Sequence, residues 1–431
     1  MRIRLVARLA ICGLMGAWLW PAHAAEDGMP VERMLGSDVA GLLEYAREHN
    51  PELAAMRFDA DAAAQRAESA AALPDPVLRA ELMDITNQGT NKSTSLLPSQ
   101  VGSTRYTLIQ SVPWFGKRDL QREAAEAGAD QARGRTATTW AELSAQIKSA
   151  YAQYYYVAGS QKITRDLLDL LAQMEKVAQV RYANGLAAQQ DAVRAQVEQT
   201  AMKTGLVALG NIMRQVEARL NALLSRPATM PLAMPQRLRS IPVTASLANH
   251  TVLANRIREH NPELFADEAG VRASEKSRDL VYRNRYPDVA LGISPTQSGN
   301  TVREWGVMVE LNIPLQQGAR RSQERESEAM LAATRARREA TVNRVLSVLA
   351  ENLSGIEAAQ RIELLSSGSL LPQAKVTFES ALAGYQIGKV DFSALLDAAR
   401  QILNARQEVL KAQIDAQMRL AEIERLLGDE L

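Results

Sequence analysis

The sequence is poor in cysteine and in aromatic residues. Cys12 is the only cysteine among 431 residues, and Phe, Trp and Tyr together make up 5% of the chain. Cys12 lies in a segment that we expect to be removed, so the mature protein would have no disulfide and no thiol chemistry. A chain rich in alanine and charged residues but poor in aromatics favours long helices.

An excess of charge of one sign is also missing. Lys and Arg number 50 against 49 Asp and Glu, a net charge of +1, which argues against a general electrostatic grip on nucleic acid. The sequence has no nucleophile–base constellation, phosphate loop or metal-hydrolase motif. His49, His250 and His260 have no metal-ligand spacing. We therefore expect no enzyme, no cofactor and no tightly bound metal.

The first 24 residues predict a secretory signal peptide. Three arginines precede the apolar segment LAICGLMGAWLW, and Ala22–Ala24 reads AHA, a small-x-small cleavage site. An uncleaved anchor is the alternative, but the apolar run is short for a membrane span. Lipidation at Cys12 is a second alternative, which the bulky Ile11 before it disfavours. Beyond residue 24 no uncharged apolar run reaches about 18 residues, so we expect no transmembrane helix.

The heptapeptide REHNPEL occurs twice, at Arg47–Leu53 and Arg258–Leu264, and 258 minus 47 places the copies 211 positions apart. Within it, Asn-Pro-Glu is typical of a helix start: Asn as cap, Pro as first helical residue and an acid in the first turn. Such a spacing, nearly half the chain, indicates two tandem structural repeats.

Each copy continues with strands and a long helical hairpin. After Pro287, PDVALGIS and EWGVMVELNI alternate apolar and polar residues, which predicts two half-apolar strands, and weaker alternation follows Pro76. Residues 117–181 predict one helix of about 98 Å, and Pro372 predicts a helix restart in the second copy. We assign residues 25–226 to repeat 1, 227–245 to a proline-rich linker and 246–431 to repeat 2.

Four strands are too few to close a barrel, and an open sheet leaves exposed edges. Three chains would supply twelve strands, a number that fits outer-membrane barrels, and cyclic symmetry would close the ring. Trp305 and Tyr106 would then lie in an interfacial aromatic girdle. The expected fold is thus mainly α, with a trimeric 12-stranded β-barrel continued by a periplasmic α-helical barrel.

The repeated plan, with Tyr-x-x-Gly at both hairpin tips, resembles the TolC-type outer-membrane efflux proteins over essentially the whole mature chain. The resemblance implies a homotrimeric channel in the outer membrane of a Gram-negative bacterium. It also implies contact with outer-membrane lipid and docking on a periplasmic adaptor protein and an inner-membrane RND pump.

The segment PWFGKR, at residues 113–118, resembles the strand-to-helix corner of the heavy-metal branch, the CusC and CzcC type. The alternative is a glycine corner with basic residues at a barrel rim. We favour the metal branch, which implies heavy-metal cations as the substrate.

The resemblance also identifies candidate gate residues near the tips. Asp191, six residues after Gly185, matches the gate aspartate of the first hairpin. Tyr385, three residues before Gly388, matches the gate tyrosine. Asp397, twelve residues after Tyr385, matches the inner of two acidic rings. Three copies of an aspartate around an axis would concentrate cations, although an exposed aspartate near a helix start is also a common structural feature.

Two positions depart from the family pattern. Val390 occupies the place of the gate arginine, and Ala394 that of the outer acidic ring. Lys389 and Asp391 flank the first departure and would substitute for the missing arginine.

The tips themselves carry a second expectation. The resemblance assigns Tyr182, Gly185 and Gly388 to adaptor docking. Three other functions stay open for the chain: a multidrug efflux duct, a type I secretion duct of the same fold, and a periplasmic coiled-coil scaffold that crosses no membrane.

Overall fold

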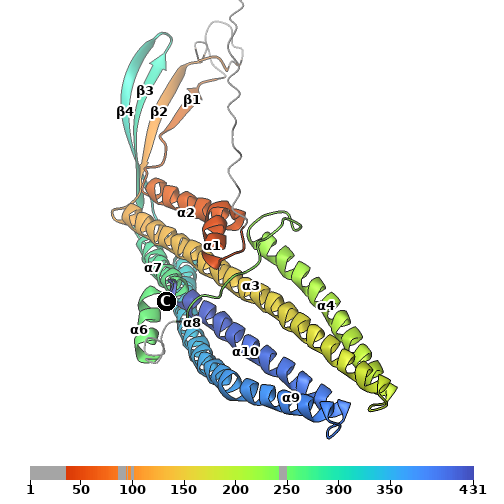
Figure 1. Ribbon diagram of the computed structural model, residues 1–431. Coiled ribbons are helices and arrows are strands. Elements are labelled where there is room, and N and C mark those ends of the chain that lie inside the picture. The colour runs from red at the N-terminus through yellow and green to blue at the C-terminus, as the bar shows by residue number, and fades with distance from the viewer. Residues whose placement is uncertain (1–34, 86–93, 95, 99–100, 242–249) are drawn as a thin grey trace, which may run out of the picture. The chain divides into compact units, whose positions relative to one another are not determined.

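The computed structural model describes residues 35–85, 94, 96–98, 101–241 and 250–431. The expected signal peptide and Cys12 lie outside the described residues. The chain runs helix, helix, strand, strand, long helix and helix, and then repeats this order with one long helix divided (Figure 1). The first six elements are α1 Val39–His49, α2 Pro51–Ala70, β1 Val77–Met83, β2 Ser103–Val112, α3 Lys117–Ala183 and α4 Gln189–Leu223. The later elements are α6 His250–His260, α7 Pro262–Arg283, β3 Asp288–Ser298, β4 Thr301–Asn312, α8 Gln317–Leu365, η1 Ser366–Leu370, α9 Leu371–Gln386 and α10 Phe392–Leu427. The predicted order of elements is confirmed, while the domain boundaries stay predictions.

The repeated heptapeptide forms a corner between two helices. Its first three residues end α1 or α6, and its last three begin α2 or α7. The Asn50 side chain accepts hydrogen bonds from the backbone N–H groups of Glu52 and Leu53, at 2.9 and 3.1 Å. The Asn261 side chain accepts one from Leu264 N–H at 2.8 Å. The predicted caps are therefore confirmed.

Each asparagine also has a role that local sequence does not reveal. The Asn50 side-chain amide donates to the carbonyl of Leu223 at 3.0 Å, and Asn261 donates to that of Leu426 at 2.7 Å. Leu223 ends α4, and Leu426 is the penultimate residue of α10. Each corner is thus tied to the end of the helix that returns from its hairpin.

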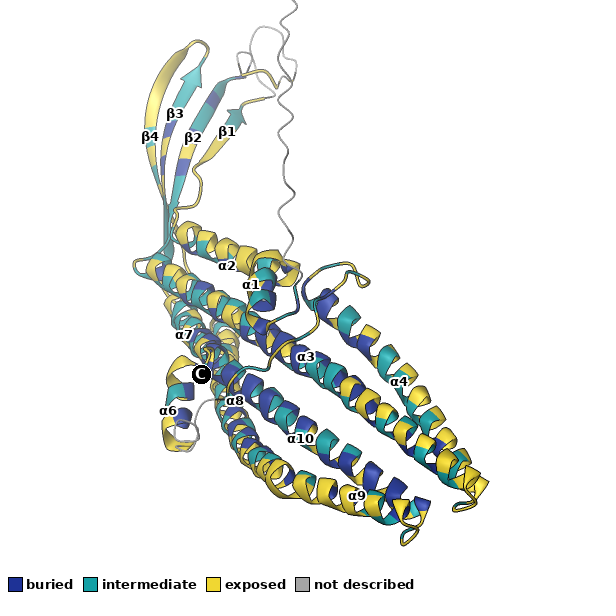
Figure 2. Cartoon of the chain, in the orientation of Figure 1, coloured by how far each residue is buried: buried dark blue, intermediate teal, exposed yellow. Residues whose placement is uncertain are grey.

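The strands form one antiparallel sheet in the order β1-β2-β3-β4. The register aligns Leu78, Leu108, Ile293 and Val307 in one row across all four strands. Their exposed fractions run from 53% for Leu108 to 82% for Val307. Figure 2 shows β4 exposed along much of its length. One face of the sheet therefore carries an apolar row that nothing in the described chain covers.

The other face of the same sheet is polar. Glu81, Arg105, Thr296 and Glu304 form a second row across the four strands. Arg105 lies 3.9 Å from Glu81. Alternation with a period of two separates the two rows, so the predicted half-apolar strands are confirmed.

The first hairpin is built on α3, a single helix of 67 residues, or about 100 Å at 1.5 Å per residue. It packs against α4, α10, α7 and α2. In the part of the chain that the structure describes, three separate apolar cores follow the long helices, one of them around the tips. Among the described helices, none is long and apolar enough to cross a membrane.

The second hairpin differs in its outgoing helix. We expected a helix restart at Pro372, but the chain passes without a break from α8 through the π-helical turn η1 into α9. Leu371 N–H bonds to the carbonyl of Ser366, five residues back. A proline has no N–H and clashes with the carbonyl four residues earlier, and a wider turn accommodates both effects.

The helices before the two strand pairs have different surroundings. α7 lies between α3 and α8. Lys276 on α7 pairs with Glu123 on α3 at 2.7 Å, and Glu275 pairs with Arg335 on α8 at 2.6 Å. α2 packs along α3, and no second helix of the described chain covers it to a similar extent.

The PWFGKR corner joins the two halves. Gly116 has φ 79° and precedes α3. The buried Lys117 ammonium donates to Asp288 at 2.8 Å and to the carbonyl of Tyr286 at 3.0 Å. Trp114 stacks on Tyr286 at 5.6 Å between ring centroids. Lys117 of this corner is therefore a structural tie between the first and second halves.

Candidate functional site

Both hairpins end in the same backbone arrangement. Gly185 and Gly388 have φ of 71° and 77°, the left-handed conformation that closes a helix. In each tip an N–H bonds five residues back, from Leu186 to Arg181 and from Lys389 to Gly384, both at 2.8 Å. The glycines predicted to close the helices are therefore confirmed as such.

Tyr385 and Asp191 meet across the two hairpins. The Tyr385 hydroxyl at the end of α9 donates to an Asp191 carboxylate oxygen in the first turn of α4, at 3.0 Å. Tyr385 is 2% exposed and packs edge-on against Phe392, 5.4 Å between centroids. Burial, followed by the bond to Asp191, raises the pKa of Tyr385 to about 12. Tyr385 is thus a neutral hydrogen-bond donor throughout the physiological range.

Arg181 is a third member of this site, and the sequence reasoning missed it. Its guanidinium carbon lies 4.7 Å from the centroid of the Tyr385 ring, and Nη2 donates to the carbonyl of Leu186 at 2.9 Å. The signal was available, since Arg181 immediately precedes the Tyr-x-x-Gly motif of the first tip. The family pattern places the positive charge at residue 390, and the sequence offered only Lys389 beside it as a substitute. We call Arg181, Asp191 and Tyr385 the tip cluster.

The residues expected to replace the gate arginine lie elsewhere. Val390 packs so close to Gly384 that a Cβ on that glycine would lie 2.6 Å from its Cγ2. The Lys389 side chain is exposed. Asp391 caps α10, accepting from Ala394 N–H at 3.0 Å, and this bond holds the pKa of its carboxyl below the usual value. The structure does not bring Lys389 or Asp391 to the Tyr385 hydroxyl.

The remaining predicted residues lie near the tip cluster but outside it. Tyr182 is 49% exposed. Asp397 lies on α10, with its side chain 67% exposed and 3.6 Å from the Arg400 guanidinium. Arg400 in turn forms two hydrogen bonds with Glu198 on α4, at 3.1 and 2.6 Å. Glu198 and Arg400 were not predicted, because no local pattern joins residues of different hairpins.

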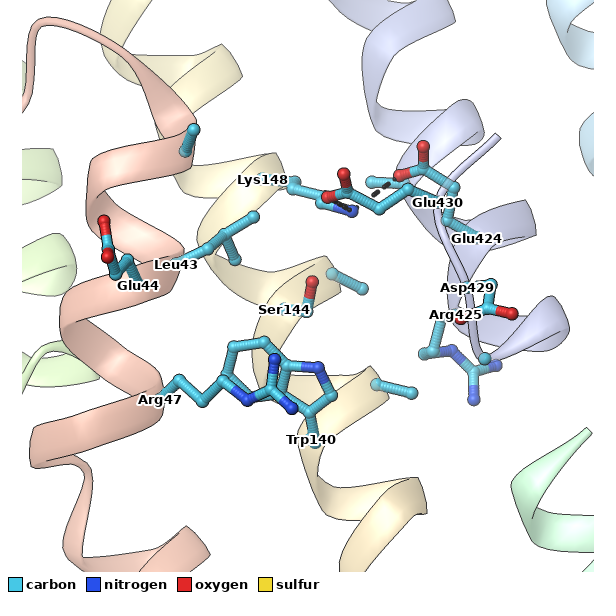
Figure 3. Close-up of a pocket in the computed structure, with 15 residues that line it drawn as sticks. Leu43, Glu44, Arg47, Trp140, Ser144, Lys148, Glu424, Arg425, Asp429 and Glu430 are labelled. Carbon is cyan, nitrogen blue, oxygen red and sulfur yellow. Dashed lines mark hydrogen bonds and ion pairs between the residues drawn. The ribbon is translucent and has the colours of Figure 1, made fainter.

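A second polar group joins the hairpins far along α10 from the tips. Lys148 on α3 pairs with Glu424 on α10 at 2.8 Å and with Glu430 at 3.0 Å (Figure 3). Arg239 pairs with Glu424 at 2.9 Å. Burial alone would raise the pKa of Glu424, but the bonds from Arg239 and Lys148 hold it below its ordinary value. We call Lys148, Arg239, Glu424 and Glu430 the root cluster.

A cavity of about 400 Å³ adjoins the root cluster, between α1, α3 and α10 (Figure 3). Arg47 lies over the Trp140 ring on its wall, 5.5 Å from the centroid. Lys148 and Glu424 are already paired with each other here. Within the described residues, no group of three or more His, Cys, Asp or Glu side chains is arranged to hold a metal ion.

Comparison with known proteins places these features in a family. The outer membrane efflux protein family matches residues 42–226 and 253–429. The cobalt-zinc-cadmium resistance protein CzcC of Cupriavidus metallidurans is 22% identical, over 96% of this chain and 98% of that protein. The outer-membrane channel OprN is 21% identical with a TM-score of 0.77, covering 92% of this chain and 93% of OprN.

Two further solved structures share the fold. CusC has a TM-score of 0.78 at 16% identity, covering 92% of this chain and 93% of CusC. VceC of Vibrio cholerae has a TM-score of 0.76 at 19% identity, covering 91% of this chain and 96% of VceC. The chain therefore has the fold of outer-membrane channel proteins.

Proposed function

The chain belongs to the outer membrane efflux protein family, and from this premise we propose that it is the outer-membrane duct of a tripartite efflux system for heavy-metal cations. Membership of the family makes it a non-enzymatic efflux channel of the outer membrane that extends into the periplasm. A scaffold that crosses no membrane is thereby excluded. The observation that carries the metal assignment is the likeness to CzcC along 96% of the chain.

The sheet supports a trimer. The outer edges of its strands β1 and β4 have no partner within the described chain, and unpaired edges favour pairing with another copy. Three copies would bring twelve strands together, an even number in the range of outer-membrane barrels. In that ring the row of Leu78, Leu108, Ile293 and Val307 would face lipid, and the row containing Glu81 and Arg105 would face the lumen.

The helices support the same assembly. α7 is held between α3 and α8, whereas α3 is the one helix of the described chain that packs extensively against α2. A neighbouring copy's α8 on the open side of α2 would give α2 the surroundings that α7 already has. Val197 and Val207 on α4 are 64% and 74% exposed, and Leu364 and Leu365 on α8 are 71% and 64% exposed. Joining such apolar edges between copies would remove them from water.

The tips support docking on a periplasmic adaptor and, through it, an inner-membrane RND pump. Tyr182, Gly185 and Gly388 lie at the ends of the hairpins, where we place the adaptor contact. Leu186 and Ile387 beside the two glycines are 66% and 68% exposed. Exposed apolar groups at the two turns suit contact with a protein partner.

The tip cluster supports the proposal that the channel is closed at its periplasmic end. Asp397 supports the proposal that it conducts cations. The bond from Tyr385 to Asp191 ties the second hairpin to the first, so the tips separate only when it breaks. Asp397 belongs to an exposed polar stripe of α10, which continues through Gln401 and Asn404. Facing the lumen of a trimer, three Asp397 carboxylates would form a ring that attracts cations.

A gene deletion tests the substrate. The deletion strain should become sensitive to one or more of cobalt, zinc, cadmium, copper and silver, while its tolerance of dyes and antibiotics stays unchanged. A plasmid copy of the gene should restore tolerance. New sensitivity to drugs with unchanged metal tolerance would reject the metal assignment in favour of a multidrug duct. Loss of a secreted protein without either sensitivity would identify a type I secretion duct.

Native mass spectrometry of the detergent-purified protein tests the assembly separately. We expect a mass of three mature chains. A monomer that nonetheless supports metal tolerance in cells would contradict the trimer and leave the substrate assignment standing.

A further inference from the structure

Arg400 lies between two carboxylates that belong to different hairpins. Glu198 on α4 accepts both of its hydrogen bonds, and Asp397, one turn earlier on α10, lies 3.6 Å from another guanidinium nitrogen. Glu198 is 7% exposed, whereas the Asp397 side chain is 67% exposed. The same arginine therefore contacts one buried and one exposed acid.

We propose that Arg400 is a positioning residue that sets the effective charge of the Asp397 ring, because Glu198 holds the guanidinium away from full pairing with Asp397. The proposal rests on the proposed function, which places Asp397 at the lumen of a cation-conducting trimer.

The two contacts differ in strength. A planar guanidinium that meets a carboxylate with two parallel bonds makes the strongest kind of ion pair. The bond to Glu198 accordingly raises the pKa of Arg400 above its usual value. A buried carboxylate without its partner is costly, so Glu198 keeps the arginine. The contact with Asp397 is longer and lies in solvent, where an ion pair is weak. In this arrangement Arg400 neutralises only a small part of the negative charge of the Asp397 carboxylate.

Two substitutions should therefore change the effective negative charge of the Asp397 ring in opposite directions. Glu198→Gln removes the charge that holds Arg400, so the guanidinium is free to pair with Asp397 and to neutralise the ring. Arg400→Gln removes the cation that lies 3.6 Å from Asp397 and leaves the ring more negative. A purely structural role predicts the same direction for both, since each breaks the same tie between α4 and α10.

The experiment measures the K⁺/Cl⁻ permeability ratio from reversal potentials of the full-length trimer in planar bilayers under a KCl gradient at low salt. We expect Asp397→Asn and Glu198→Gln to lower the ratio and Arg400→Gln to raise it. Each change should be roughly fivefold at most, the Boltzmann factor for two unit charges about 4 Å apart in water. It should shrink as salt screens the ring.

Arg406→Gln is the matched control. Arg406 also lies on α10 and pairs across to the first hairpin, with Asp166 on α3 at 3.0 Å. Its substitution breaks a tie between the hairpins without touching the contacts of Asp397, so the ratio should not change. Each variant is first checked for trimer formation by native mass spectrometry.

The outcomes distinguish the role of Arg400 from the placement of Asp397 in the proposed channel. If Asp397→Asn changes the ratio but Glu198→Gln and Arg400→Gln shift it in the same direction, or not at all, the role of Arg400 is overturned while the ring stands. If Asp397→Asn leaves the ratio unchanged, the placement of Asp397 in the proposed channel is wrong, and the role of Arg400 falls with it. In the double variant Asp397→Asn/Arg400→Gln, we expect the ratio of Asp397→Asn alone.

Discussion

The root cluster and the tip cluster both join the first hairpin to the second, but with different chemistry. At the root, the Lys148 and Glu424 side chains are 4% and 3% exposed, and each has a second charged partner. At the tips, the buried Tyr385 makes one hydrogen bond to Asp191 and receives the Arg181 guanidinium on its ring. Asp191 and Arg181 are both partly exposed.

This difference indicates where the hairpins can separate. Removing one member of a buried ion pair typically costs roughly 3–5 kcal/mol. A hydrogen bond to a charged group contributes about 1.5–3 kcal/mol, and a cation–π contact about 0.5–2 kcal/mol. The root cluster is therefore the fixed end of the second hairpin, and the tip cluster contributes weaker contacts between the hairpins than the root cluster does. A channel that opens at the hairpin tips while the rest of the helices stay packed requires stronger contacts at the root cluster than at the tip cluster.

The largest effect on stability is expected for Glu424→Gln in the root cluster. It leaves Lys148 and Arg239 without their shared buried carboxylate, so we expect a loss of stability of roughly 3–5 kcal/mol. The thermal denaturation of the detergent-purified protein measures it. Glu408→Gln, at an exposed position of the same helix, is the control and should have no effect. A midpoint equal to that of the unaltered protein would show that the root cluster is not the fixed end.

Acid should remove the contribution of Glu424 to the root cluster. The folded pKa of Glu424 is depressed, so its contribution is complete above the unfolded value of about 4.3 and is lost as the pH falls through the folded value. The midpoint difference between the unaltered protein and Glu424→Gln should stay constant from pH 7 to about 5 and shrink below about 4. A difference that is the same at pH 7 and pH 3 would contradict this assignment.

At the tips, Tyr385→Phe should have a smaller effect on stability but a visible one on conduction. Losing the bond to the Asp191 carboxylate costs about 1.5–3 kcal/mol, while the ring still packs on Phe392 and under Arg181. We expect longer or more frequent open periods in single-channel recordings, equally at pH 5 and pH 9, because the pKa of Tyr385 is about 12. Tyr182→Phe serves as the control. If gating is unchanged by Tyr385→Phe, the tip cluster does not hold the entrance closed.

The sequence predicted those parts of the fold that depend on neighbours along the chain. Alternation identified the strands, Asn-Pro-Glu identified the helix starts at Asn50 and Asn261, and the absence of proline identified α3. It failed at Pro372, where a proline predicts a break but the π-helical turn η1 carries the helix onward. A proline excludes a regular α-helix locally, and the packing of the surrounding helices decides how the chain adapts.

The site was predictable only in part for a related reason. Tyr385 and Asp191 followed from the resemblance, but the contact of Arg181 joins two hairpins and has no local periodicity. The bond from Lys148 to Glu424 spans 276 positions, and at that separation any of the 50 basic residues is an equally good candidate by sequence. Only the packing of α10 against α3 selects this pair.

The smallest effect should distinguish the two tips from each other. Gly185→Ala and Gly388→Ala both place a side chain at positive φ, which costs roughly 1 kcal/mol. A Cβ at residue 185 meets nothing within 4 Å, whereas one at residue 388 would lie 3.3 Å from Nη2 of Arg181. Both variants should therefore lose similar stability, but only Gly388→Ala should also displace the guanidinium from the Tyr385 ring and lengthen the open periods. Equal gating in the two variants would mean that Arg181 adjusts without loosening the tyrosine, and that within the tip cluster the hydrogen bond to Asp191 is the contact that holds Tyr385.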